Sequence, residues 1–196
     1  MQPSTFYHLY NHANGNENLF RNDENYRFFL QKYAKHISPV ADTYAYCLMP
    51  NHLHFLIKIK SEEEIISAFG KFANQQKLEY RISKQFANLF SSYTQAYNKV
   101  FERRGSLFIP NFKRKAIEDD DYFTNLVHYI HSNAVHHGFV KNTHELPHSS
   151  YHALQSTKVT KLKREEVWAW FYGKEEFLKI HSTLNPSNKL LLEMDF

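Results

Sequence analysis

Two histidines separated by a single residue, His52 and His54, are the first candidates for chemistry in this sequence. They lie in the segment 52–59, whose apolar residues alternate, so we expect a β-strand with both imidazoles on one face. Neutral imidazoles at this spacing bind Mn, Co, Ni or Zn, or help to hold a hydrated Mg, and leave coordination positions open for a phosphodiester. A pair of strand histidines that only hydrogen-bond to neighbours is the structural alternative, and it stays open at this point.

Tyr129 and Asn133 form a second candidate pair, four residues apart in a predicted helix. This spacing places the phenol and the amide on one face of the helix, beside an apolar stripe formed by Phe123, Leu126 and Ile130. A phenol with a pKa of about 10 is a poor nucleophile until its surroundings activate it. The alternative is a tyrosine at the margin of the core whose hydroxyl bonds to a backbone carbonyl.

The elements that must position these residues follow from hydrophobic periodicity and turn residues. Met49, Pro50 and Asn51 form a turn that joins two apolar segments into a hairpin. The order strand, helix, hairpin, helix, strand, helix predicts an α+β fold of ferredoxin-like character, an antiparallel sheet with helices packed mainly on one face. The predicted strands are 5–12, 42–48, 52–59 and one beginning at 105–109; the predicted helices are 24–37, about 61–86, one with an acidic start at 118–121 that runs to about 133, and two short helices within 165–183.

The composition changes beyond Tyr151, where a basic polar linker at 158–164 precedes the short C-terminal helices. We therefore expect a catalytic domain over 1–151 and a helical extension over 152–196.

Positive charge is concentrated in one segment. Residues 71–115 contain ten basic and two acidic side chains, so this segment carries +8, whereas the whole chain carries +4. A basic block on a nearly balanced background indicates a polyanionic partner such as nucleic acid, although a solvated face with a chance charge bias is the alternative. The basic residues are Lys71, Lys77, Arg81, Lys84, Lys99, Arg103, Arg104, Lys113, Arg114 and Lys115.

Composition argues against a disulfide-bonded, a membrane-spanning and a secreted protein. The single cysteine, Cys47, allows no intrachain disulfide, and its apolar surroundings predict a buried core residue. No apolar stretch approaches the about 18 to 20 residues of a membrane span, and the N-terminus has no secretory pattern. We therefore expect a cytoplasmic protein without a membrane partner.

Six stretches, in this order along the chain, resemble the single-tyrosine HUH transposases, the enzymes of the smallest bacterial insertion sequences and the related REP-associated tyrosine transposases. The resemblance spans residues 5–151, and its most specific part is the segment with the two histidines. The stretches are 7–12 (YHLYNH), 19–23 (LFRND), 26–30 (YRFFL), 46–57 (YCLMPNHLHFLI), 104–108 (RGSLF) and 129–135 (YIHSNAV).

The resemblance implies a mechanism. His52 and His54 would hold a divalent metal, Mg or Mn, with Asn133 as a further ligand, and Tyr129 would attack single-stranded or hairpin DNA to form a 5′-phosphotyrosine. That linkage keeps the bond energy for rejoining, so no nucleotide cofactor is needed, and the DNA would lie along 71–115. Insertion-sequence members act as dimers and some REP-associated members as monomers, which leaves a homodimer open.

The chain departs from the family in one turn. REP-associated members usually continue Asn-Pro-Val-Arg-Ala-Gly after the tyrosine, whereas residues 133–138 read Asn-Ala-Val-His-His-Gly. The missing arginine raises a question about a DNA or structural contact in that turn, and it does not affect the groups expected to perform the chemistry. The alternatives are a catalytically silent protein that binds DNA or RNA hairpins, a metal-dependent phosphodiesterase that uses water, and a non-catalytic protein whose C-terminal helices bind a partner.

Overall fold

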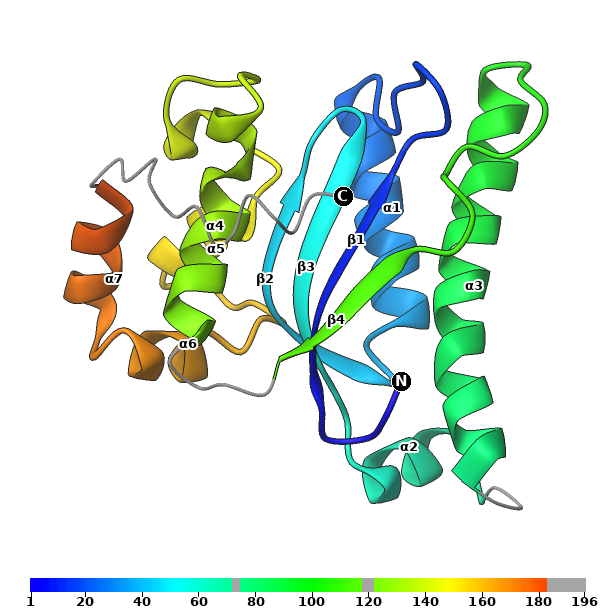
Figure 1. Ribbon diagram of the computed structural model, residues 1–196, viewed down its shortest axis with the longest axis horizontal. Coiled ribbons are helices and arrows are strands. Elements are labelled where there is room, and N and C mark those ends of the chain that lie inside the picture. The colour runs from blue at the N-terminus through cyan, green and yellow to red at the C-terminus, as the bar shows by residue number, and fades with distance from the viewer. Residues whose placement is uncertain (72–74, 118–121, 183–196) are drawn as a thin grey trace.

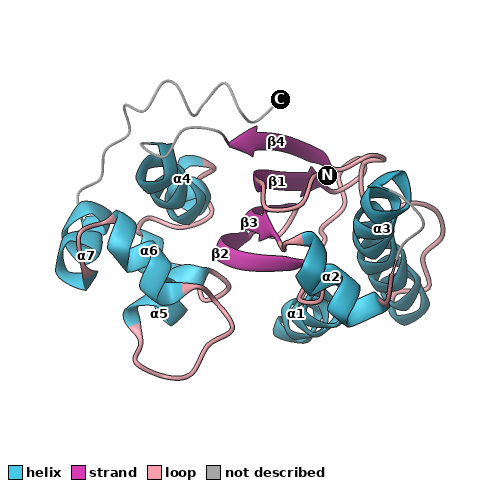
Figure 2. Cartoon of the chain, turned by 90° about the horizontal axis from the view of Figure 1, so that it is seen from below, coloured by secondary structure: helices cyan, strands magenta, loops and turns pink. Residues whose placement is uncertain are grey.

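A computed structural model describes residues 1–71, 75–117 and 122–182 of the chain. The fold has three layers, because helices cover both faces of a central sheet (Figure 2). None of the helices in these ranges is long and apolar enough to cross a membrane.

The sheet has four strands in the order β2-β3-β1-β4, and every neighbouring pair is antiparallel. Its strands are β1 (Phe6–His12), β2 (Ala41–Leu48), β3 (His52–Ile59) and β4 (Lys113–Ile117). β2 and β3 form the predicted hairpin around the turn at 49–51 (Figure 1). Because His12 pairs with His52 and Tyr10 with His54, the side chains of β1 join the two histidines on one face.

One face of the sheet is covered by α1 (Asp23–His36) and by α3 (Gln75–Val100), which packs on α1. The Asn22 side chain caps α1, and Ser61 begins α2 (Glu62–Phe69) with a reciprocal capping box. Gly70, at φ 83°, ends α2, a conformation that glycine adopts without steric cost. The core between these layers is rich in aromatic rings, among them Phe29, Phe55 and Tyr93.

The opposite face is covered by α4 (Tyr122–His136) and by short helices that follow it. These are the 3-10 turn η1 (Thr143–Glu145), α5 (Ser150–Gln155), α6 (Arg164–Trp170) and α7 (Lys174–Ser182). Val167 of α6 and Phe177 of α7 belong to the same buried cluster as Leu126 and Tyr129 of α4. The backbone N–H of Lys163 donates to the carbonyl oxygen of Thr43, which ties the segment before α6 to β2.

The predicted α+β class with an antiparallel sheet is confirmed, as are the hairpin and the buried Cys47. Three details differ. The helices cover both faces instead of mainly one, the helix expected over 61–86 is two helices, and 105–109 forms only an isolated bridge, Ala13 with Phe108, before β4 begins at Lys113. The acidic start at 118–121 lies outside the described residues, and the domain boundary at 151 stays a prediction.

Candidate functional site

His52 and His54 lie on the same face of the central strand, as their spacing predicts. Their rings are 5.4 Å apart, nearly perpendicular, and almost completely buried against α4. Two more side chains of β1 extend the cluster: the His12 ring stacks on His52 at 4.6 Å, and His8 stacks on His54 at 5.2 Å. The site is thus built on two adjacent strands of the sheet.

The contacts of His52 fix which of its nitrogens is a donor. Nδ1 lies 2.7 Å from Oδ1 of Asn51, an oxygen that can only accept, so this contact requires a proton on Nδ1. Nε2 then presents a lone pair, and it faces Oδ1 of Asn133 at 3.3 Å. Two facing acceptors can be reconciled in two ways. A cation lies between them, or the Asn133 amide is turned so that its nitrogen donates to His52. In the described part of the chain, Nδ2 of Asn133 is buried without a hydrogen-bond partner.

His54 is held through its other ring nitrogen. Its Nδ1 lies 3.0 Å from Nε2 of His8, so Nε2 is the nitrogen of His54 that would ligate a metal. A ligating histidine commonly uses its second nitrogen for such an orienting hydrogen bond. Burial first, and then the neighbouring His8 and His52, lower the pKa of His54 well below its ordinary value. The ring is therefore neutral, which is the protonation state that binds metals.

Tyr129 reaches the same cluster from α4. Its ring lies edge-on to His54 at 5.9 Å and to His8 at 6.1 Å, and only 2% of its surface is exposed. Tyr122, the other tyrosine of this helix, lies seven residues away, about 10 Å along the axis, and is only partly buried, at the margin of the same apolar cluster. The structure therefore brings Tyr129, and not Tyr122, to the histidines.

The donor set is compatible with a divalent metal. Two imidazoles and one carboxamide oxygen would leave positions for phosphate oxygens, and the facing atoms of His52 and Asn133 suit a cation. Nowhere in the described ranges do three histidine, cysteine or carboxylate side chains form a set that could hold a metal. The amide of Asn133 is thus the third protein ligand that the site offers.

The ten predicted DNA-binding cations do not form one compact patch. Four lie on α3, whose 26 residues span about 39 Å, and nine of the ten are exposed. Arg103 is the exception: it pairs with Glu17 at 3.1 Å and donates to the carbonyl oxygen of Ser106, so it holds the loop after α3. Lys113, Arg114 and Lys115 are exposed on the edge strand β4.

Three histidines of the cluster were not anticipated from the sequence: His8, His12 and His137, whose ring lies 4.5 Å from His52. The signal for two of them was present, because His8, Tyr10 and His12 alternate in the same way as the histidines of β3. Strand pairing was needed to place them beside His52 and His54, and such pairing is not visible in local periodicity.

Comparisons with known proteins find one sequence relative and one solved structure of similar fold. A Haemophilus influenzae protein that carries the name of a REP-associated tyrosine transposase is 26% identical over 113 residues, which are 57% of this chain and 59% of that protein. The alignment thus covers less than two thirds of the relative. A solved structure of a REP-associated tyrosine transposase bound to a REP hairpin has the same fold, with a TM-score of 0.55 and 20% identity over 78% of this chain and 79% of that one. No protein-family model matches the chain. The resemblance to the REP-associated tyrosine transposases that the motifs indicate is confirmed by the sequence relative, and the fold of that family by the solved structure.

Proposed function

We propose that this chain binds hairpin DNA and cleaves and rejoins a single strand through a covalent bond to Tyr129. The observation that carries this proposal is the position of Tyr129, which α4 places edge-on against His54 and His8 while Asn133, one turn later, faces His52. On this face of the sheet Tyr129 would be the nucleophile, His52, His54 and Asn133 would hold the metal, and Lys113 and Lys115 of β4 would add positive charge beside them. The solved relative, which is bound to a REP hairpin, supports the same class of substrate.

Cleavage and rejoining both take place at the hydroxyl of Tyr129. The phenolic oxygen of Tyr129 bonds to the phosphorus and loses its proton, and the 3′ oxygen leaves as a hydroxyl. A 3′ hydroxyl later attacks the phosphotyrosine, the tyrosine is released with its proton, and the strand is rejoined without a nucleotide cofactor. A divalent metal held by His52, His54 and Asn133, when bound, would stabilise negative charge on the phosphate. Lys113 and Lys115 share the face of β4 that continues Tyr10 and His8, where they would neutralise neighbouring phosphates.

Tyr129→Phe tests the proposal on labelled hairpin DNA with a single-stranded flank, in the presence of Mn or Mg. On a denaturing gel, we expect the unmodified protein to give a DNA-linked species and Tyr129→Phe to give none, while hairpin binding is unchanged. Tyr122→Phe is the matched control, because it removes a hydroxyl from the same helix away from the histidines.

Each other outcome points to an alternative. A DNA-linked species with Tyr129→Phe would overturn the assignment of the nucleophile. Cleavage without a linked species would indicate a phosphodiesterase that uses water. Hairpin binding without any cleavage would indicate a silent descendant of the same fold.

A further inference from the structure

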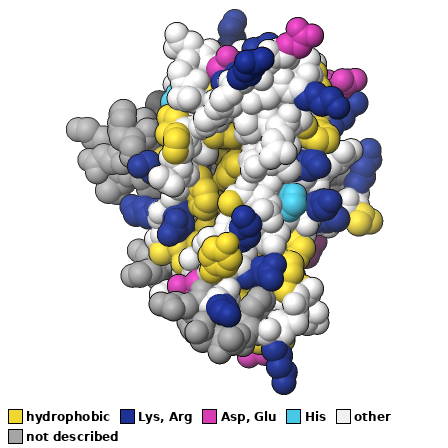
Figure 3. Space-filling view, turned by 90° about the vertical axis from the view of Figure 1, so that its right-hand side faces the viewer, with side chains coloured by type: hydrophobic (Ala, Val, Ile, Leu, Met, Phe, Trp, Pro, Cys, Tyr) yellow, Lys and Arg dark blue, Asp and Glu magenta, His cyan; other side chains and the backbone are white. Residues whose placement is uncertain are grey.

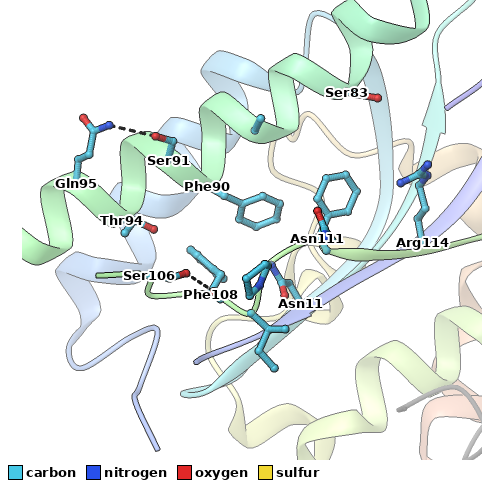
Figure 4. Close-up of a pocket in the computed structure, with 14 residues that line it drawn as sticks. Asn11, Ser83, Phe90, Ser91, Thr94, Gln95, Ser106, Phe108, Asn111 and Arg114 are labelled. Carbon is cyan, nitrogen blue, oxygen red and sulfur yellow. Dashed lines mark hydrogen bonds between the residues drawn. The ribbon is translucent and has the colours of Figure 1, made fainter. Parts of the chain in front are cut away.

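Strand β1 presents different side chains to the two layers of helices. Asn11 lies on the α3 side, where it lines a pocket of about 520 Å³ between α3 and the segment 106–112 (Figure 4). Figure 3 views this side of the molecule, where Lys and Arg side chains border an apolar strip. His8, Tyr10 and His12 alternate with Asn11 and therefore lie on the opposite face, with the histidines of β3. His8 is completely buried on that face.

The His8 side chain is directed along the sheet rather than toward its direct neighbours. The strand register places it opposite Leu56 of β3 and Lys115 of β4. Its Nε2 nevertheless lies 3.0 Å from Nδ1 of His54, two residues before Leu56, which is a diagonal contact between adjacent strands. A buried polar group is costly unless it is hydrogen-bonded, and an apolar side chain would fill this space without that cost. The contact with His54 is therefore what an imidazole provides at this position.

Two aromatic rings enclose the pair formed by His8 and His54. The Tyr10 ring stacks on His8 at 5.1 Å and on His54 at 5.7 Å, and the Tyr129 ring lies edge-on to both imidazoles. The two imidazoles are 0% exposed and nearly parallel, with 18° between their planes. A hydrogen bond in such surroundings is stronger than one in water. The pair is thus a fixed unit directly beside Tyr129.

The hydrogen bond has a defined direction when His54 ligates a metal. A neutral imidazole carries one proton, so a lone pair on Nε2 of His54 requires the proton on Nδ1. That Nδ1 donates to Nε2 of His8, which accepts, and the proton of the His8 ring then lies on its own Nδ1. The nitrogen of a histidine that binds a metal is set by the hydrogen bond of the other nitrogen. Loss of such a partner typically weakens metal binding by about 10- to 100-fold.

We propose that His8 is a positioning residue of the metal site, which holds His54 in the rotation and the tautomer that direct its Nε2 to the metal. Without this acceptor the His54 ring can rotate or change tautomer, and the metal is bound more weakly although every ligand remains. This inference rests on the proposed function, because it assumes that His54 ligates a metal. It adds a residue of a neighbouring strand to those that determine the affinity for that metal.

The test is a Co²⁺ titration of the full chain without DNA, followed by the visible absorption of the bound ion. His8→Leu removes the acceptor and keeps an apolar side chain in its place, so we expect Co²⁺ to bind about 10- to 100-fold more weakly. His8→Gln places its carboxamide oxygen near the position of Nε2 and should restore most of the affinity. His8→Asn is one bond shorter and should bind as weakly as His8→Leu; it replaces that variant if His8→Leu does not fold.

The matched control is His148→Leu, which removes an imidazole that bonds to Asp23 and stacks on Tyr26, outside the cluster. It should leave the Co²⁺ affinity unchanged, and a loss equal to that of His8→Leu would overturn this inference. Unweakened binding by a folded His8→Leu or His8→Asn, or no recovery in His8→Gln, would also overturn it. An unmodified chain that binds no Co²⁺ would do the same, whereas the DNA-linked species on the denaturing gel decides the proposed function separately.

Discussion

The buried Ser150 side chain is expected to stabilise this fold, because it links the backbone of β2 to the side chain of His131 on α4. The N–H of Tyr46 donates to its Oγ at 2.8 Å, and its hydroxyl lies 2.7 Å from Nε2 of His131. Nδ1 of His131 in turn lies 2.8 Å from Nε2 of His181, whose own Nδ1 donates to the carbonyl oxygen of Phe177. Since a carbonyl only accepts, every donor in this chain is determined, and it ends with Ser150 donating to His131.

Ser150→Ala removes one oxygen and leaves two buried groups, the N–H of Tyr46 and Nε2 of His131, without a partner. An unsatisfied buried polar group costs about 1 to 3 kcal/mol, so we expect a loss of about 2 to 6 kcal/mol in the free energy of unfolding. The neighbouring Ser149→Ala is the control, because Ser149 mainly caps α5 by accepting from Tyr151, a contact that contributes about 1 kcal/mol.

Urea unfolding followed by the fluorescence of the α6 tryptophans measures both variants under the same conditions. If Ser150→Ala lowers the free energy of unfolding no more than Ser149→Ala does, the directional chain of hydrogen bonds does not hold this side of the fold together.

Three further predictions concern His181 of the same hydrogen-bond chain, the buried Cys47, and the two arginines after α3. Burial lowers the pKa of His181 to about 3, so below about pH 6.5 the unfolded chain binds more protons than the folded one. This group should therefore lower the free energy of unfolding by up to about 1.4 kcal/mol per pH unit toward pH 4. His181→Gln should flatten this slope in urea titrations. Burial raises the pKa of Cys47 to about 12, so a thiol reagent should label it only after denaturation. Arg104→Glu should weaken single-strand binding and reduce its salt dependence in anisotropy titrations, whereas Arg103→Ala should mainly lower the melting temperature, because Arg103 holds the loop after α3.

The parts of the fold that the sequence predicts well are those in which one local pattern decides the structure. The alternation of 52–59 and the turn before it determine the hairpin and the shared face of His52 and His54. The helical spacing of Tyr129 and Asn133 likewise places both toward the histidines. In each case, the relevant period lies within a single element.

The parts that the sequence does not predict depend on contacts between distant segments. β4 reads Lys-Arg-Lys-Ala-Ile, which has no apolar alternation, because an edge strand exposes most of its side chains and is recognised only by its pairing with β1. The last part of α3 is polar and basic, which leaves its local pattern ambiguous, yet Leu89, Tyr93 and Tyr97 recur at intervals of four and are buried. Helices on both faces follow from the second core around Leu56 and Tyr44, whose strands bury side chains on each side.

The two halves of the candidate site belong to different layers of the fold. The histidines lie on β3, whose backbone pairs with strands on both sides and should open to hydrogen exchange only when the whole domain unfolds. Tyr129 lies on α4, which is joined to the sheet by side-chain packing. The separation between Tyr129 and the imidazoles of His52 and His54 therefore depends on the volume of the side chains packed between α4 and the sheet. Conservative replacements in this buried cluster, such as changes at Val127 or Leu154, offer a way to change that separation while Tyr129 and the histidines stay unaltered.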